Sequence, residues 1–318
     1  MDHRETEAGR RQSWHGAKRY AKRVLGWRVP NAAMRAAIRV RPSAASPRLP
    51  APVHITEVEG RIGDARFFML RPDRCVVAKE LYWGKGRRPG AADQLALEVF
   101  ERLAARSDTS TVVDIGAYTG IFTLLSVAAN PTLHAHAFEI VPEVFLGLFE
   151  NVVRNDVLPR VTLHPAGIGE PGTVTMPVNY GGSALPDFLS TSTVFTEGVT
   201  VPVRSLDSLL PELPGDGIVI VKIDVEGTED RVLAHGQHLL AERRPDILCE
   251  VLAGVADPIA LENLLEPHGY HFFKVGETEL RPSRRIRPDT HLRDWLFTTL
   301  SDEELRDTGV PVGTTEDS

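Results

Sequence analysis

The stretch TVVDIGAYTGIFTLLSVAA, residues 111–129, predicts a buried strand that runs through a short turn into a buried helix. Its two adjacent valines suit a strand packed on both faces, and from Ile121 onward the apolar residues have helical spacing. Gly116 and Gly120 bracket the turn, where the missing Cβ atoms let a ligand approach the backbone and the helix start offers N–H groups. Two glycines alone fit an ordinary βα turn equally well, so the residues that follow decide between the two interpretations.

Two acidic residues favour a turn that binds a nucleoside. Asp114 ends the predicted strand and faces the same crevice as the turn. The segment LHAHAFEI, residues 133–140, predicts a second short strand that ends in Glu139, 25 residues after Asp114. In doubly wound sheets an acidic residue roughly 20 residues beyond the glycine turn accepts hydrogen bonds from ribose hydroxyls. The order of strand, glycine turn, helix, strand and acid therefore predicts a nucleoside-containing ligand.

The composition is typical of a soluble globular protein. The chain has 318 residues, of which 42% are apolar and 25% charged, enough for one large domain or two small ones. Cys75 and Cys249 lack the spacing of a zinc site and the density of a disulfide scaffold, so both are predicted to be reduced thiols. No apolar run approaches the roughly 18 residues of a membrane span, and residues 1–13 are too polar to open a signal peptide. These features predict a cytoplasmic protein.

The charge is distributed unevenly along the chain. Residues 1–50 carry 12 Lys and Arg against 3 acidic residues, a net +9, so the net −7 of the whole chain leaves −16 for the rest. Residues 1–52 are predicted to be a basic leader and Pro-rich linker, either flexible or docked. Peripheral membrane contact or nucleic-acid contact through this leader is the less favoured alternative. Residues 301–318 predict an acidic, frayed tail.

The remainder divides into a cap and an α/β domain. Residues 53–106 predict an N-terminal cap, with strands in RFFML and CVVAKELYW followed by a helix over 91–105. Residues 107–300 predict the main domain, because alternating strands and helices imply a parallel sheet with right-handed crossovers. Residues 171–203 interrupt the alternation and predict a hairpin-like insertion. The predicted strands are 111–115, 134–139, 161–166, GIVIVKIDVEG, DILCEV, HGYHFFKVG and one near DWLFTTL, and the predicted helices are 119–129, 142–155, SLDSLLPEL, 227–241 and 257–267.

Five segments resemble the FkbM family of S-adenosylmethionine-dependent methyltransferases. They are DIGAYTGIFTLLS, AFEIVPE, GIGEPGTVTM, VPVRSLDSLL and, most specifically, VKIDVEGTEDRVLAHGQHLL, and the resemblance runs from about Leu81 to Val251. It implies an α/β, Rossmann-like class I methyltransferase fold. In that fold a mostly parallel seven-stranded sheet has an antiparallel final strand and helices on both faces. It also implies S-adenosylmethionine as cofactor and, usually, transfer of its methyl group to a hydroxyl oxygen. Tyr118 takes the middle place of three alternating glycines, a substitution that is common in this family.

The resemblance also implies a set of site residues. The glycine turn would line the amino acid end of the cofactor, Glu139 would hold the ribose, and the backbone near 166–168 would lie beside the adenine. Asp224 and Glu226 would face the sulfonium and the acceptor. The predicted cofactor residues are Asp114, Gly116, Ala117, Tyr118, Gly120, Glu139, Ile140, Ala166, Gly167, Ile168 and Asp224.

Methyl transfer needs an acceptor oxygen held in line with the methyl group and a base for its proton. Asp224 and Glu226 lie at the carboxyl end of the predicted fourth strand, where alternation would put both side chains on one face, and Glu250 ends the next strand. These three are the predicted catalytic residues. Two close carboxylates could instead ligate a divalent cation, or Glu226 could cap the next helix while Asp224 holds the cofactor's ammonium group. The 11 histidines show no metal-site spacing, so no metal is predicted and His136 is interpreted as structural.

Three rival functions are less favoured. An NAD(P)-dependent oxidoreductase would carry G-x-G-x-x-G, but Tyr118 replaces a glycine and no other glycine follows Gly120 until Gly147. A nucleic-acid methyltransferase is disfavoured because a body of net charge −16 repels phosphate. A non-catalytic binding module would have no need of all the acidic residues named above. The sequence therefore predicts a methyltransferase of secondary metabolite biosynthesis, whose acceptor is a small-molecule hydroxyl on a sugar or polyketide-like product.

Overall fold

The fold is that of a computed structural model, which describes residues 32–33, 49–178, 185–186, 189, 191–192 and 195–314. Most of the predicted basic leader, residues 1–52, lies outside the described residues, as do residues 315–318 of the predicted tail. Within the described residues, no helix combines the length and the hydropathy that a membrane span requires.

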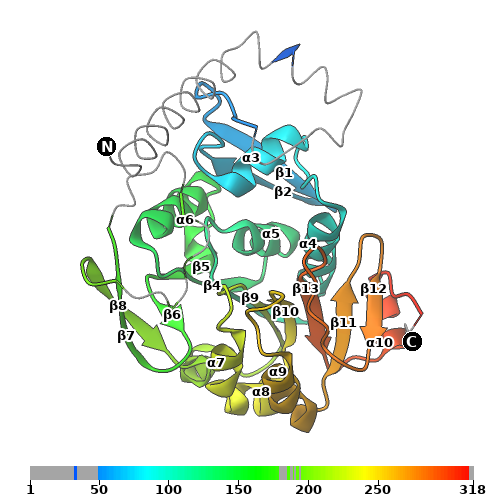
Figure 1. The fold of residues 1–318 in the computed structure, drawn as a ribbon. Helices are drawn as coiled ribbons and strands as arrows, with labels where there is room; N and C mark the ends of the chain where they lie inside the picture. The colour runs from blue at the N-terminus through cyan, green and yellow to red at the C-terminus, as the bar shows by residue number, and fades with distance from the viewer. Residues whose placement is uncertain are drawn as a thin grey trace, which may run out of the picture.

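A central sheet organises the molecule (Figure 1). Strands β3, β4, β5, β9 and β10 run parallel, whereas β13 pairs antiparallel with both β10 and β11. The predicted mostly parallel α/β sheet with an antiparallel final strand is thus confirmed. In sheet order, the strands are β12 (Leu280–Ser283), β11 (His271–Val275), β13 (Asp294–Thr298), β10 (Asp246–Glu250), β9 (Ile218–Ile223), β3 (Thr109–Ile115), β4 (His134–Phe138) and β5 (Val161–His164).

The predicted number of seven strands is wrong, because the described part of the sheet has eight. The additional strand is β12, which pairs antiparallel with β11 at the sheet edge. Its sequence LRPS contains Pro282, which cannot donate to a ladder and is tolerated on an edge strand. The four residues of β12 have no alternating apolar pattern from which a strand could be predicted. The strand is recognised from its pairing with β11.

Helices cover both faces of the central sheet. Val112 packs into one hydrophobic core and its neighbour Val113 into the other, as expected for a strand buried on both faces. The first core includes residues of α4 (Ala91–Ala104), α5 (Ile121–Ala129) and α6 (Pro142–Arg154). The second includes residues of the 3₁₀ helix η3 (Leu206–Glu212), α7 (Glu229–Ala234), α8 (Gln237–Arg243) and α9 (Pro258–Leu265). Short 3₁₀ turns η2 (Leu158–Arg160) and η4 (Glu266–His268) precede β5 and β11.

The N-terminal hairpin docks on the helices of the first face. Strands β1 (Glu57–Ile62) and β2 (Ala65–Leu70) pair antiparallel, and their apolar residues join the core formed by α4 and α5. Asn151 of α6 and Asn155, which follows this helix, bind the backbone of β2: Asn151 Oδ1 accepts from Leu70 N at 2.8 Å, and Asn155 Oδ1 accepts from Phe68 N at 2.7 Å. These asparagine side chains therefore accept hydrogen bonds from backbone N–H groups at the edge of β2 that would otherwise lack partners.

The strand predicted in CVVAKELYW is wrong, because these residues form helix α3 (Val76–Trp83). The adjacent valines favour a strand locally. However, Cys75 Sγ accepts a hydrogen bond from Ala78 N at 3.4 Å and caps a helix start, and buried Ala78 and Leu81 lie at helical spacing. Burial of this face against the hairpin and α4 overrides the local preference of two β-branched residues.

The predicted insertion contains a hairpin, as expected. Strands β7 (Gly172–Met176) and β8 (Val199–Arg204) pair antiparallel, and β6 (Gly167–Ile168) joins β8 to give a separate three-stranded sheet among the described residues. Residues 179–184, 187–188, 190 and 193–194 of the intervening loop are outside the described residues.

Two further predictions near the C-terminus are corrected. The single helix predicted over 227–241 is divided into α7 and α8, because the chain turns at Gly236, whose added Cβ would lie 2.6 Å from Leu206 Cδ2. The tail predicted to be frayed contains helix α10 (Asp302–Asp307), which starts with a capping box between Ser301 and Glu304. This reciprocal pair satisfies backbone N–H groups that otherwise have no intrahelical partner.

Candidate active site

A cavity of about 420 Å³ opens at the carboxyl ends of β3, β4, β9 and β10. Its volume lies within the range of roughly 300 to 1,000 Å³ that is typical of small-molecule sites. Parallel α/β sheets place ligands at this edge, where the strand order reverses around β3. Nine of the eleven predicted cofactor residues line the cavity: Gly116, Ala117, Tyr118, Glu139, Ile140, Ala166, Gly167, Ile168 and Asp224.

The glycine turn lies directly against the end of β9. Gly116 has φ 74°, and a Cβ at this position would stand 1.8 Å from the carbonyl oxygen of Asp224. Asp224 N donates to Ile115 O at 3.0 Å, which ties the two strand ends together. Only glycine permits this approach. The glycine turn and the loop that carries Asp224 and Glu226 therefore form one wall of the cavity.

Glu139 is buried at the tip of β4 and binds the turn from the other side. Its Oε2 accepts from Tyr118 N at 2.9 Å, and its Oε1 accepts from Val141 N at 2.7 Å. Burial raises the pKa of Glu139 to about 7 in spite of these hydrogen bonds. Since each carboxylate oxygen can accept more than one hydrogen bond, the side chain retains capacity for a ligand in the cavity that it lines.

Asp114 and Gly120, which were also predicted to lie beside the cofactor, do not line the cavity. Asp114 is buried behind the turn, where its Oδ2 accepts from the backbone N (3.0 Å) and the Oγ1 (2.6 Å) of Thr123. It thereby occupies the first turn of α5 with a carboxylate, while its Oδ1 has no hydrogen-bond partner among the described residues. Burial raises the pKa of Asp114 to about 6. Gly120, with φ 89°, packs against Leu148.

The three predicted catalytic carboxylates converge on the cavity. Each of Asp224, Glu226 and Glu250 offers an oxygen within 4.8 Å of the others. The prediction that strand alternation aligns the first two is wrong, because β9 ends at Ile223 and Glu226 has φ 57°, a left-handed conformation. A turn, not an extended strand, brings the two side chains together.

Glu250 has the most strongly altered environment of this group. Its Oε1 lies 3.0 Å from Arg293 Nη1, and its side chain is nearly buried. Burial and the neighbouring Asp224 raise the pKa of Glu250 far above its usual range, in spite of the nearby Arg293 and Lys222. The raised pKa therefore keeps this carboxyl group protonated to a higher pH than an ordinary glutamate.

A buried lysine compensates the acidic cluster. Lys222, only 1% exposed, has its Nζ 3.3 Å from Asp294 Oδ1 and 3.8 Å from Asp224 Oδ2. Burial lowers its pKa, but the carboxylates of Asp294, Asp224 and Glu250 outweigh this effect and raise it. Sequence reasoning assigned no role to Lys222 and missed Asp294, because the pair joins β9 and β13, which lie on either side of β10 and are 72 residues apart in the chain.

Sequence reasoning also missed a contribution from the N-terminal segment. Arg88, between α3 and α4, lines the cavity and donates from Nε to Glu80 Oε2 at 2.8 Å. Its backbone N donates to Gln94 Oε1 at 2.9 Å, which fixes the loop against α4. From the insertion, Pro186, Leu189 and Thr191 complete the lining. No local motif marks these residues, which reach the site only through packing.

The charged side chains of the lining are predominantly acidic. Among the described residues it contains seven carboxyl side chains and three cationic ones, the latter being Arg88, Lys222 and Arg293. An excess of carboxylates favours a ligand that carries positive charge and disfavours a polyphosphate. The carboxylate of Asp114 at the start of α5 acts in the same direction, because it occupies the helix terminus where a pyrophosphate would bind.

The strand order, the antiparallel β13 and a ligand cavity at the carboxyl edge define a class I methyltransferase fold. The family described as the Methyltransferase FkbM domain matches residues 114–272, which is half of the chain, and the chain belongs to this family. The resemblance inferred from the sequence motifs is thus confirmed. S-adenosylmethionine is the methyl donor that this family uses.

Three solved structures resemble the chain at low identity. Methyltransferase FkbM from Methylobacillus flagellatus KT is 21% identical, with a TM-score of 0.41, over 60% of this chain and 44% of that one, less than half of its length. M. jannaschii TYW2 in complex with AdoMet is 17% identical over 77% and 87% of the two chains, with a TM-score of 0.38. The N-terminal domain of human METTL16 in complex with SAH is 16% identical over 65% and 71%, also with a TM-score of 0.38. No curated protein matches the chain.

Proposed function

We propose that this protein transfers the methyl group of S-adenosylmethionine to a hydroxyl group of a small molecule, such as a sugar or a polyketide-like product of secondary metabolism. The observation that carries this proposal is the convergence of Asp224, Glu226 and Glu250 within 4.8 Å beside the glycine turn. A hydroxyl acceptor has to lose a proton as it attacks, so a site with carboxylates at the reacting end suits O-methylation.

The residues present fit this methyl donor. Glu139 would accept hydrogen bonds from the ribose hydroxyls, the turn around Gly116 would line the amino acid end, and backbone near Gly167 would lie beside the adenine. The acidic lining suits the donor's sulfonium and ammonium charges. When bound, the donor supplies an electrophilic methyl group, so the protein's main task is to position the acceptor and exclude water.

Glu250 is the proposed base. Its Oε1 is engaged by Arg293, which leaves Oε2 to receive the acceptor proton. A raised pKa makes the ionised carboxylate of Glu250 a stronger base than that of an ordinary glutamate, and the ionised fraction grows as the pH rises. Asp224, held near Lys222, would orient the acceptor together with Glu226.

The alternatives are an NAD(P)-dependent oxidoreductase and a non-catalytic binding module. The oxidoreductase is disfavoured because Asp114 already occupies the N-terminal turn of α5 with a carboxylate. A small acceptor is favoured over a nucleic acid because the cavity lining carries more carboxylates than cations, which repels phosphate. The buried free thiols of Cys75 and Cys249 are consistent with the proposed cytoplasmic location, a reducing compartment.

Calorimetry with S-adenosylhomocysteine and, separately, NAD(H) tests the proposal. We expect only S-adenosylhomocysteine to bind, and Glu139→Ala to weaken its binding by about 1.5 to 3 kcal/mol through lost charge-assisted hydrogen bonds. Glu170→Ala, at an exposed position, is the matched control and should bind as the wild type does. Binding of NAD(H) alone would establish the oxidoreductase, and binding of neither compound would favour the non-catalytic module. If the donor analogue binds, a screen of hydroxyl compounds with isotopically labelled methyl donor follows.

A further inference from the structure

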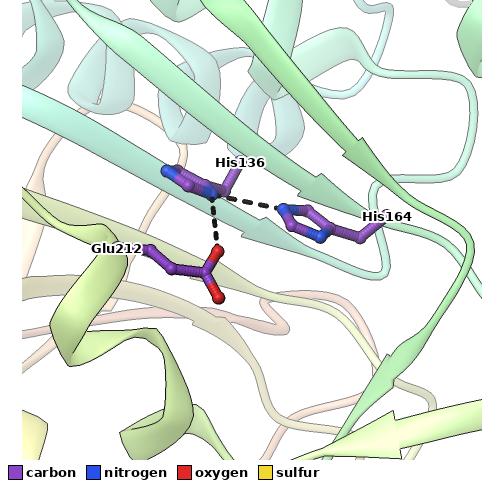
Figure 2. A group of neighbouring side chains, drawn as sticks. All are labelled: His136, His164 and Glu212. Atoms are coloured by element: carbon purple, nitrogen blue, oxygen red, sulfur yellow. Dashed lines mark hydrogen bonds and ion pairs between the residues drawn. The ribbon is translucent and has the colours of Figure 1, made fainter.

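A second cluster of potential ligands, drawn in Figure 2, lies outside the cavity lining. His136 comes from β4, His164 from the end of β5 and Glu212 from the end of η3. His136 Nδ1 lies 3.2 Å from His164 Nε2 and 3.9 Å from Glu212 Oε2, and the three donor atoms are all within 4.8 Å of one another. Figure 2 shows the imidazole of His164 and the carboxylate of Glu212 both directed at the ring nitrogen of His136.

These separations are close to those of a zinc site. With metal–ligand bonds of about 2.0 to 2.2 Å in tetrahedral geometry, donor atoms lie roughly 3.3 to 3.6 Å apart. The separation between the two histidine nitrogens is slightly shorter than this, and that between His136 and Glu212 is slightly longer. Small side-chain movements would equalise them. Two imidazoles and one carboxylate are also a donor set that zinc accepts, with water in the fourth position.

Surrounding residues hold each side chain in place. The His164 ring stacks on Phe138, with centroids 4.1 Å apart and planes 3° apart, and on the His136 ring. Arg204 binds Oε1 of Glu212, so Oε2 remains directed at His136. Such partners orient metal ligands in known sites.

We propose that His136, His164 and Glu212 bind a divalent transition metal ion of the zinc type. None of the three lines the cavity, whereas Phe138, against which His164 stacks, does. The ion would therefore have a structural role: it would join β4, β5 and η3 and fix the strand end that leads to Ala166 at the cavity. This inference does not depend on the proposed methyl transfer.

Calorimetric titration of the chelator-treated full-length protein with zinc chloride tests the site. We expect one ion to bind with micromolar or tighter affinity and to raise the melting temperature, because a ligand specific for the native state stabilises it. Glu212→Gln, at an exposed position, and His164→Gln should each weaken zinc binding at least about tenfold. Melting curves recorded in chelator verify that both variants are folded.

Two control variants distinguish zinc binding at this cluster from zinc binding by other side chains of the protein. His134→Gln removes the neighbouring imidazole, which bonds to Thr162 and lies outside the cluster, and should bind zinc as the wild type does. Glu226→Gln tests the carboxylates of the cavity and should also leave this binding unchanged. The proposal is overturned if the wild type binds no zinc, if Glu212→Gln and His164→Gln bind it normally, or if either control loses it.

Discussion

The carbonyl oxygen of Asp224 stands 1.8 Å from the point that a Cβ at Gly116 would occupy. At the same place Asp224 N donates to Ile115 O at 3.0 Å, so the ends of β3 and β9 are held in contact. The glycine turn and the loop that carries the acidic cluster consequently form one rigid unit. The sequence predicts that Gly116 allows a ligand to approach the backbone. The structure shows that a glycine is required here because the ends of β3 and β9 meet.

Gly116→Ala should lower the free energy of unfolding by about 2 kcal/mol or more, because φ 74° strains an alanine and its Cβ collides with backbone. Binding of S-adenosylhomocysteine should fall in parallel. Urea denaturation and calorimetry measure the two effects. Gly215→Ala is the control, since nothing lies within 4 Å of its added Cβ, and a stability loss no larger than in this control would contradict the prediction.

Glu139 should make the stability of the cofactor-free protein depend on pH. Its pKa is about 7 in the folded protein, against an ordinary value of 4.5, so the folded state binds the proton more tightly. The resulting stability is fully present below pH 4.5 and is lost as the pH rises through 7, by on the order of 2 to 3 kcal/mol. Glu139→Gln cannot ionise and should lose less stability over this range in urea denaturation.

The other buried acids titrate in both proteins, so the difference between the two curves reports Glu139 together with its repulsion of Asp114. Glu170→Gln, which changes an exposed carboxylate, should follow the wild-type pH dependence. Parallel curves for the wild type and Glu139→Gln would mean that Glu139 has no raised pKa.

Glu250→Gln should lower kcat about 10² to 10⁴-fold once an acceptor is known, because the amide cannot take the hydroxyl proton. Affinity for S-adenosylhomocysteine should change little. In the wild type the rate should rise with pH as Glu250 ionises, and this rise should disappear in the variant. Glu242→Gln on the exposed side of α8 is the control, and full activity of Glu250→Gln would remove this residue from catalysis.

Ser301→Ala should destabilise the protein by about 1 kcal/mol, because it removes the side-chain cap of α10. Ser301 Oγ accepts from Glu304 N at 3.3 Å, and Ser301 N donates to Glu304 Oε2 at 2.7 Å. Ser301→Asp retains a capping oxygen and should keep most of the stability in thermal denaturation. Equal stability of the alanine variant and the wild type would show that α10 contributes little to global folding.

Local patterns were reliable where one physical requirement dominates. Val112 and Val113 predict a strand buried on both faces, and each packs into a different core. Patterns failed where packing overrides propensity: the valines at the start of α3 favour a strand, but their segment is helical. They also failed for β12, whose four residues become a strand only by pairing with β11.

The sequence by itself determined the sheet type, the family and the part of the cavity lining at the glycine turn and the strand ends, because strand periodicity, the glycine turn and the strand-end acids are local features. Only the tertiary structure decided that Asp114 supports α5 instead of lining the cavity, and that Lys222 meets Asp294. It likewise joins His136, His164 and Glu212 from three separate elements. The physical reason is that contacts between distant segments follow from how sheet edges and loops pack, and no spacing along the chain encodes them.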